Sequence, residues 1–428
     1  MQFILMSMTA LLFTTSTYGQ DVNKEADKFE KLADSLGEAK QYKSAAQHYI
    51  TESNLRKMTA YKRQPAVNAA YYYAMAQMPD SAQVCFEKAV KCYGFNNLEW
   101  LDSEPALSGM RKTKRYTKLK RYMSERNKKK QDPDNAMLIT SDIDLFWKVF
   151  DRYKKDTSNA QQLFLTEYFE KGSENLQEYY KIKTPNIGGI NGFVRNIAMM
   201  PNFYESIRAN TLQISAIKDT IRVIFRSLKN WYDPGVFPDA TFVIGGWSSG
   251  GTVTDYGSIM GVDMQSADET TPTNELNLWQ QKNLILFKEM KHVAAHELIH
   301  VQQNHMAGDT TLLCHAIKEG MADFIGELIS GKVANQRLHI WALGREKKIW
   351  EEFKKEMFLN RYSNWIANSN QETPDRPADL GYWIGYQICK SYFDEAINKK
   401  SAISEMLDIQ DYRAFLIKSK TDEKLLGR

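Results

Sequence analysis

The sequence predicts a mostly α-helical, α+β protein, in which an N-terminal region of helical repeats precedes a larger domain with a small β-sheet and a helical C-terminal part. Three observations predict this fold class. Helical periodicity runs through residues 21–126, short β-rich runs occur between residues 221 and 262, and helical periodicity returns near Asn283 and continues to the end. With 43% hydrophobic residues, the 428-residue chain can bury sizeable cores in two or three domains.

The first residues have the pattern of a secretory signal peptide. An apolar run at residues 3–13 is followed by a small-residue site at residues 17–19, and the run is too short to span a bilayer. We therefore place a signal peptide at residues 1–19 and expect an exported protein, periplasmic or secreted. No cysteine follows the run, so no lipid anchor is expected there. No later run is long enough for a transmembrane segment in the mature chain.

Residues 20–127 resemble tetratricopeptide-like helical repeats. Within residues 36–49, small residues stand where two antiparallel helices must approach each other, and Tyr42 and Tyr49 are their large partners. A second copy follows at residues 69–89. Because such arrays need about three units to bury a continuous core, we expect this one to pack against the rest of the chain. Its concave face could bind a protein partner, and a structural cap is the alternative.

A basic stretch closes the repeat region. Between Arg111 and Lys130 there are eleven Lys or Arg residues and one acid, with tyrosines between them. Such a stretch is typical of nucleic-acid-binding proteins, whereas the alternative is a solvated helix face. Because export is expected, no nucleic-acid partner is predicted.

A charged, proline-interrupted segment without apolar period predicts a linker at residues 128–140, so that the second domain spans residues 141–428. Helices are expected at the start of this domain. Two short runs rich in β-branched residues, 221–226 and 240–244, are predicted as strands because Pro and Gly bound them. A glycine-rich turn follows at residues 245–251.

The four cysteines predict at most one disulfide. Cys85 and Cys92 are seven residues apart in a helical pattern, which separates them by about 10 Å along the axis. A disulfide tolerates only about 7 Å between Cα atoms, so both are predicted to be core residues. Cys314 and Cys389 could be either paired or free.

The motif His-Glu-x-x-His at residues 296–300 predicts a metal site. Histidines four residues apart lie on one face of a helix, so His296 and His300 can bind one ion while Glu297 points at a water bound to it. Glu319 is placed to be the third protein ligand of a catalytic Zn²⁺. Asp323, one turn further, could accept a ring N–H of a liganding histidine. The alternative is an ordinary helix with hydrogen-bonded histidines.

These five residues resemble the metal motif of the gluzincins, zinc peptidases with two histidines and a distal glutamate as ligands, and in particular a family of predicted zinc-dependent proteases. Residues 172–180 and 201–208 look like the leading helices of that family. The resemblance implies hydrolysis of a peptide or protein substrate by a zinc-activated water, with Glu297 as the general base.

The resemblance also implies a stabilising tyrosine and a substrate-binding strand. Tyr382, in a Tyr-x-x-Gly context, resembles the transition-state tyrosine of one gluzincin branch, and Tyr386 is the reserve. Extended peptides pair with an edge strand in this superfamily, and Ile259, Met260 and Gly261 stand where that strand is expected. The aminopeptidase motif Gly-x-Met-Glu-Asn is absent, so the resemblance favours an endopeptidase.

The sequence therefore predicts an exported zinc endopeptidase. One alternative is a peptide- or protein-binding repeat module with a structural or vestigial metal site. Glu297 favours the enzyme, because a structural site has no use for a carboxylate aimed at the fourth coordination position. A metallohydrolase that acts on a non-peptide substrate is the third hypothesis.

Overall fold

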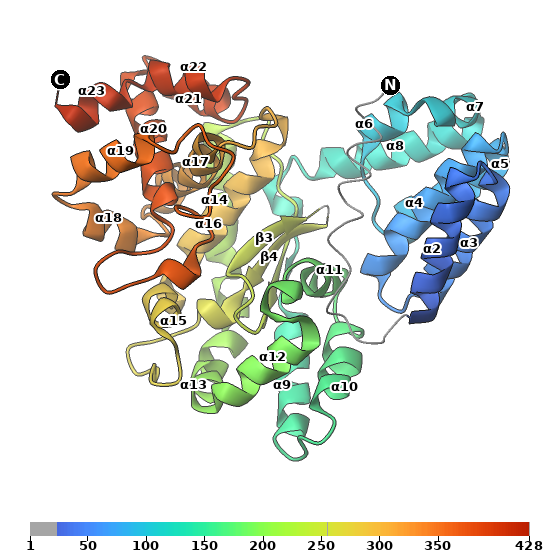
Figure 1. Cartoon of the computed structure of the whole chain (residues 1–428), viewed down its shortest axis with the longest axis horizontal. Helices are drawn as coiled ribbons and strands as arrows, with labels where there is room; N and C mark the ends of the chain where they lie inside the picture. Colours follow the sequence, from blue (N-terminus) through green and yellow to red (C-terminus); the bar gives the residue numbers. More distant parts are fainter. Residues whose placement is uncertain (1–23, 255, 428) are drawn as a thin grey trace.

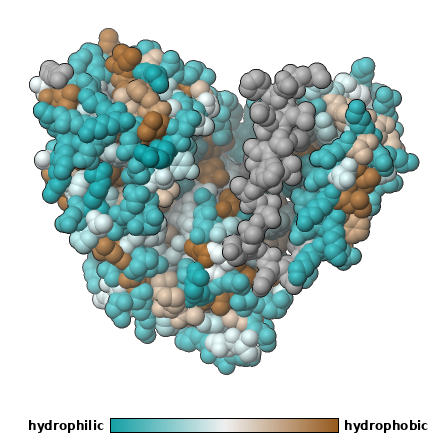
Figure 2. All heavy atoms as spheres, in the orientation of Figure 1, coloured by the Kyte–Doolittle hydropathy of each residue, from teal (hydrophilic) through white to brown (hydrophobic). Residues whose placement is uncertain are grey.

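The computed structural model describes residues 24–254 and 256–427. Figure 1 shows two lobes, an array of helices on one side and a larger body with the sheet on the other. The predicted fold class is confirmed, because the described chain is mostly helical and has a small four-stranded sheet. The expected signal peptide lies outside the described residues. Figure 2 shows that hydrophilic side chains cover most of the visible face of both lobes.

The array consists of paired helices with a core of its own. Its elements are α2 (Lys24–Glu38), α3 (Tyr42–Leu55), α4 (Thr59–Met75), α5 (Pro79–Cys92), α6 (Leu98–Ser103), η1 (Pro105–Leu107), α7 (Ser108–Arg111) and α8 (Lys114–Lys129). From α2 to α5, each helix packs on the next. Ala33, Ala46 and Ala70 are fully buried between them, since a small side chain lets two helix axes come close.

The first part of the main body is helical. Its elements are η2 (Pro133–Asn135), α9 (Ser141–Tyr153), α10 (Ala160–Phe164), η3 (Leu165–Phe169), α11 (Glu174–Ile182), η4 (Thr184–Ile187), α12 (Gly189–Met199), α13 (Pro201–Leu212), η5 (Ile214–Ile217) and α14 (Lys218–Trp231). The strand predicted at residues 221–226 is wrong, because this run lies inside α14. Ile221, Ile224, Phe225 and Leu228 are buried. Their spacing of three and four residues is the period of a helix and not the alternation of a strand.

The sheet contains β1 (Leu138–Ile139), β2 (Asp239–Val243), β3 (Gly251–Thr254) and β4 (Gly257–Gly261), in the order β1-β2-β4-β3. The strands β1, β2 and β4 are parallel, and β3 is antiparallel to β4. The predicted strand at residues 240–244 corresponds to β2. The segment predicted as a linker differs from expectation, because it holds the end of α8 and also β1, which pairs with β2.

The remaining chain surrounds this sheet with helices. Its elements are η6 (Val262–Met264), α15 (Leu278–Asn283), η7 (Phe287–Glu289), α16 (Met290–Gln302), η8 (Gln303–His305), α17 (Leu312–Ser330), α18 (Gln336–Ala342), α19 (Glu346–Lys354), η9 (Ser369–Gln371), α20 (Leu380–Glu395), α21 (Lys399–Met406), α22 (Tyr412–Ser419) and α23 (Thr421–Leu426). The helix α16 packs on β3 and β4 on one side and on α17 on the other. None of the described helices combines the length and the apolar character that a membrane crossing requires.

The two lobes touch where α4 meets α11. A guanidinium nitrogen of Arg63 lies 2.6 Å from a carboxylate oxygen of Glu178, and both side chains are largely buried. Close by, the hydroxyl of Tyr256 donates to the backbone carbonyl of Tyr93 at 2.5 Å. The array therefore contacts both α11 and the turn between β3 and β4.

Candidate metal centre

Two helices bring the three predicted metal ligands together. His296 and His300 lie on α16, and Glu319 lies on α17. Their ligand atoms all lie within 4.8 Å of one another. The Nε2 atoms of the two histidines are 3.0 Å apart. The carboxylate oxygen Oε2 of Glu319 lies 3.5 Å from Nε2 of His296 and 3.2 Å from Nε2 of His300. Ligands at about 2.0–2.1 Å from a tetrahedral zinc ion are roughly 3.3 Å apart, so these separations fit such an ion.

The far side of each imidazole is held by an acceptor. The Nδ1 atom of His296 lies 2.8 Å from a carboxylate oxygen of Asp323, whose two oxygens accept from the amide of Asn335 at 2.9 and 3.0 Å. The Nδ1 atom of His300 lies 2.9 Å from the side-chain oxygen of Gln303. The amide nitrogen of Gln303 donates to the carbonyl of Lys318, which fixes the orientation of that amide.

These hydrogen bonds determine which ring nitrogens can bind a cation. Because a carboxylate and an amide oxygen only accept, the Nδ1 atoms of His296 and His300 carry the hydrogens. The Nε2 lone pairs of the neutral rings then converge on one point together with the carboxylate of Glu319. Three electron-rich atoms at this distance repel one another unless positive charge lies between them.

The pKa shifts agree with a demand for positive charge. Burial lowers the pKa of His296, but hydrogen bonds with the carboxylates of Asp323 and Glu319 outweigh it, and this pKa is held well above its usual value. Burial raises the pKa of Glu319, but the positive charge of the two imidazoles holds it well below its usual range. Without a metal, protons on the imidazoles supply the charge that a cation would otherwise supply.

Glu297 lies beside the three ligands and is not one of them. Its side chain is buried against the first residue of β3, and a Cβ atom added to Gly251 would lie 2.1 Å from its carboxylate oxygen. Burial raises the pKa of Glu297, although the neighbouring histidines lower it. The edge strand β3 therefore confines this carboxylate next to the cluster.

The structure separates the two tyrosines predicted as candidates. The ring of Tyr382 stacks on the ring of His296, with centroids 5.9 Å apart and planes at 15°. Burial and the nearby carboxylate of Glu319 hold the pKa of Tyr382 well above its usual value, so its hydroxyl keeps its proton. The hydroxyl of Tyr386 instead donates to Glu327, outside the cluster.

A close helix crossing brings Tyr382 to this position. A Cβ atom on Gly320 of α17 would lie 1.9 Å from the backbone nitrogen of Tyr386, and one on Gly385 of α20 would lie 1.7 Å from the carbonyl oxygen of Ala316. The two helices therefore pack backbone against backbone, which only glycine permits. This crossing joins the helix of Glu319 to the helix of Tyr382.

The predicted substrate strand is not at the edge of the sheet. Ile259, Met260 and Gly261 lie on β4, which pairs with β2 on one side and with β3 on the other, and all three are buried. The edge prediction for these residues is wrong, because β4 pairs with β2 on its inner side and the other strand of its hairpin, β3, takes the edge position. The edge strand beside Glu297 is β3.

Asp263, which follows β4 by two residues, has a structural role. Its fully buried carboxylate accepts from the backbone nitrogens of Gly245 and Trp247 at 3.0 and 2.9 Å, and from the hydroxyl of Tyr204 at 3.2 Å. It thereby anchors the glycine-rich turn that leads into β3.

Gln303 and Asn335 are the contacts that sequence reasoning missed. Gln303 stands three residues after His300, so helical spacing could have indicated it. Asn335 follows the end of α17 and carries no local signal.

All four cysteines lie within the described residues and are free, and Cys92 is exposed rather than in the core.

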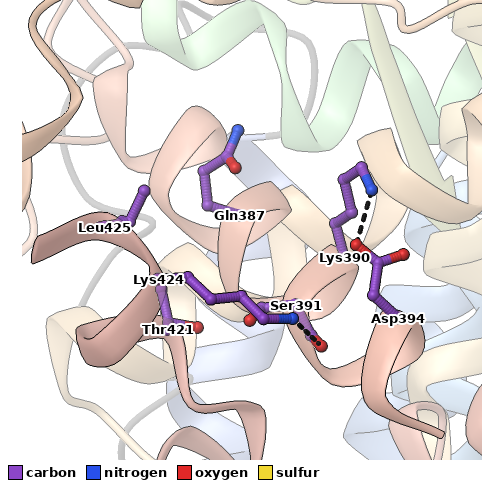
Figure 3. A pocket seen from close by; sticks show the side chains of 7 residues that line it. All are labelled: Gln387, Lys390, Ser391, Asp394, Thr421, Lys424 and Leu425. Atoms are coloured by element: carbon purple, nitrogen blue, oxygen red, sulfur yellow. Dashed lines mark hydrogen bonds and ion pairs between the residues drawn. The ribbon is translucent and has the colours of Figure 1, made fainter. Parts of the chain in front are cut away.

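A hollow lies between α20 and α23, away from the metal cluster (Figure 3). It is lined by Gln387, Lys390, Ser391, Asp394, Thr421, Lys424 and Leu425. Lys390 pairs with Asp394 at 2.7 Å, and Lys424 donates to the carbonyl of Ser391 at 3.2 Å. With its cations already engaged, this hollow has no chemistry comparable to that of the cluster.

Comparison with models of known families gives a match over most of the chain. A family model described as gliding motility protein GldB, a lipoprotein family, matches residues 126–422, which include the whole metal cluster. No curated protein and no solved structure matches the chain.

This match corrects two predictions. The identification as a gluzincin-type protease is wrong, because the matching family is one of motility lipoproteins. The peptidase function, which depended on that resemblance, is wrong for the same reason. The prediction of export is supported, since lipoproteins are exported and anchored to a membrane. The same finding runs against the expectation that no lipid anchor follows the signal peptide, whose residues lie outside the described part.

Proposed function

The chain belongs to the family of the gliding motility protein GldB, and on this premise we propose that it is a metal-binding protein of the gliding apparatus. We assign it to the periplasmic or outer side of a membrane. Its proposed cofactor is one Zn²⁺ ion, bound by His296, His300 and Glu319. The family match covers all three ligands, so the metal centre lies in the part of the chain that defines the family.

One observation carries the proposal of a metal site. The three ligand atoms are separated by 3.0, 3.2 and 3.5 Å, close to the edges of a zinc tetrahedron. Asp323 and Gln303 hold the hydrogens on the opposite ring nitrogens, which leaves both Nε2 atoms free to bind. A histidine in a core also needs an acceptor for its ring N–H, so the distinguishing feature is that both Nε2 atoms and the carboxylate of Glu319 face the same point.

We further propose that the site is hydrolytic rather than structural. Structural zinc sites have four protein ligands, whereas this group has three among the described residues. A zinc ion in such a site lowers the pKa of a coordinated water to about 7. Glu297, confined beside the cluster by Gly251, would accept the proton of the attacking water. The protonated hydroxyl of Tyr382 would donate to the oxygen that gains negative charge.

Metal analysis of the purified full-length chain tests the ligands. The wild type should contain about one zinc ion per chain, and His296→Ala or Glu319→Ala should lose nearly all of it, since an incomplete site binds weakly. His292→Ala is the matched control, because His292 lies one turn before His296 but bonds to Ser330 instead. Equal zinc contents in all four proteins would refute the metal site.

A motility assay separates a hydrolytic from a structural role. In a gliding cell whose own gene copy is deleted, Glu297→Gln should keep its zinc but fail to restore gliding. The amide has the shape of the acid yet cannot accept a proton, and such losses typically cost about 10² to 10⁴ in rate. Tyr382→Phe should weaken gliding, whereas Tyr386→Phe should not. Full restoration by Glu297→Gln would leave the metal with a structural role only.

A further inference from the structure

We propose that the outward face of α8 is a docking surface for an anionic phospholipid membrane. This face, called here the α8 basic face, consists of Lys114, Lys118, Arg121, Lys128 and Lys129. All five side chains are exposed. In Figure 1, α8 belongs to the array and extends toward the main body. The proposal is independent of the metal centre.

Nine of the eleven basic residues between Arg111 and Lys130 fall into two sets. The residues of one set form hydrogen bonds and ion pairs within the array. Arg111 donates to the carbonyl of Glu104, Arg115 pairs with Glu87, Lys120 pairs with Asp102, and Arg126 donates to the carbonyl of Phe95. The α8 basic face is the other set. Within the part of the chain that the structure describes, none of its five members forms an ion pair, so their charge is directed to the surroundings.

Helix geometry gathers these five residues on one side. Tyr116, Leu119 and Met123 bury the opposite side of α8 against the array. Lys114, Lys118 and Arg121 follow one another at intervals of four and three residues. Lys128 and Lys129 come seven and eight residues after Arg121 and lie on the same side of the helix, so the five form a stripe that the exposed Glu125 interrupts. From Lys114 to Lys129 the stripe is roughly 22 Å long, at about 1.5 Å of rise per residue.

The charge of the chain is segregated. Residues 111–130 hold eleven basic residues and one acidic residue, a net charge of +10, whereas the whole chain has a net charge of +4. The rest of the chain therefore has a net charge of −6. An anionic surface attracts the α8 basic face and repels the remainder, which gives the contact a defined orientation. The exposed ring of Tyr122 lies beside the stripe, and tyrosine favours the headgroup level of a bilayer.

The family indicates which anionic surface is at hand. Members of the matching family are lipoproteins, which are exported and anchored to a membrane, so a phospholipid surface is the anionic surface that the location of the family provides. Nucleic acid, the other partner that a basic helix fits, is not the surface to which a lipoprotein is attached.

Binding to lipid vesicles tests the proposal with the full-length chain. Each basic residue near an anionic surface contributes roughly fivefold to the partition coefficient. The variant Lys114→Gln/Lys118→Gln/Arg121→Gln/Lys128→Gln should therefore bind vesicles of phosphatidylglycerol and phosphatidylcholine more than about 10²-fold less than the wild type. Wild-type binding should also fall as salt is added, since exposed charges are screened.

The matched control removes four other exposed lysines from the main body. Lys347→Gln/Lys348→Gln/Lys355→Gln/Lys400→Gln changes the net charge equally, and should leave binding within about threefold of the wild type. Thermal unfolding verifies that both variants are folded. Equal losses in the two variants, wild-type binding to phosphatidylcholine alone, or tighter binding to duplex DNA than to anionic vesicles would each overturn the proposal.

Discussion

The array and the main body each contain a cluster of acidic side chains, and the two clusters differ in where the positive charge comes from. In the array, the guanidinium of Arg56 pairs with Asp27 at 2.6 Å, Glu30 at 3.0 Å and Glu52 at 2.7 Å. In the main body, the carboxylates meet two histidines whose free lone pairs converge. The first cluster contains a permanent cation of the polypeptide, whereas the second depends on protons or a bound cation.

This difference separates a structural ion cluster from a functional one. Arg56 carries its charge at every physiological pH, so the array cluster has a permanent cation of its own. The cluster around His296 has the same demand for charge but no permanent cation. A buried group of acids is therefore evidence for a metal only when the chain does not itself supply the charge.

Removal of the arginine should have the largest effect on stability. Arg56→Gln leaves the buried Glu52 and the partly exposed Asp27 and Glu30 without a cation. Loss of the cation of the buried Arg56–Glu52 pair costs about 3–5 kcal/mol. Urea unfolding of the full chain measures this loss, and the zinc content should not change. As a control, Arg152→Gln removes only an exposed pair with Glu167. A similar stability for both variants would contradict the structural role of the Arg56 cluster.

In the main body, the corresponding change should act on metal affinity. Asp323→Asn removes the carboxylate that holds the Nδ1 hydrogen of His296, and such changes typically lower metal affinity about 10- to 100-fold. Competition with a chelator measures the affinity. Asp309→Asn, outside the three ligands and their acceptors, is the comparison. If Asp323→Asn binds zinc as tightly as the wild type, the orienting role of Asp323 is wrong.

The two regions also differ in how closely their helices pack. Alanines separate the helices of the array, whereas Gly320 and Gly385 let α17 and α20 touch. Gly385→Ala should cost about 1–3 kcal/mol, because the added methyl group meets the carbonyl of Ala316. Gly308→Ala is the matched control, since nothing lies within 4 Å of its added atom. Equal thermal stability of the two variants would mean that the crossing can relax.

The smallest expected effect is a pH dependence of the array. Burial raises the pKa of Glu52 to about 7 from 4.5, and one of its buried oxygens has no hydrogen-bond partner. The folded state therefore holds this proton more tightly than the unfolded state, so its stabilising effect is complete below pH 4.5 and is lost as the pH rises through about 7.

Glu52→Gln tests this sign. In the wild type, the free energy of unfolding should fall between pH 5 and pH 7, by at most about 1.4 kcal/mol per pH unit from this group. The variant should lack that part of the slope, because an amide does not titrate. Parallel unfolding curves of the two proteins across this range would show that Glu52 is ionised throughout.

Local spacing decided those parts of the site that the sequence could predict. His296 and His300 share a helix face because they are four residues apart, and Asp323 follows Glu319 by the same interval on the next helix. Gln303 could have been found by the same argument. Such positions depend on the geometry of a single helix, which a sequence carries in full.

Positions across elements were decided by tertiary structure alone. Which strand lies at the sheet edge depends on how the β3–β4 hairpin docks, so Ile259 was misplaced although its strand was recognised. Tyr382 reaches His296 only because two glycines let α17 and α20 cross closely, and Asn335 reaches Asp323 only after the chain turns at the end of α17. The sequence by itself determined the spacing of the ligands within each helix. Packing determined which helices and strands meet, because a contact between residues far apart in the sequence depends on every element that lies between them.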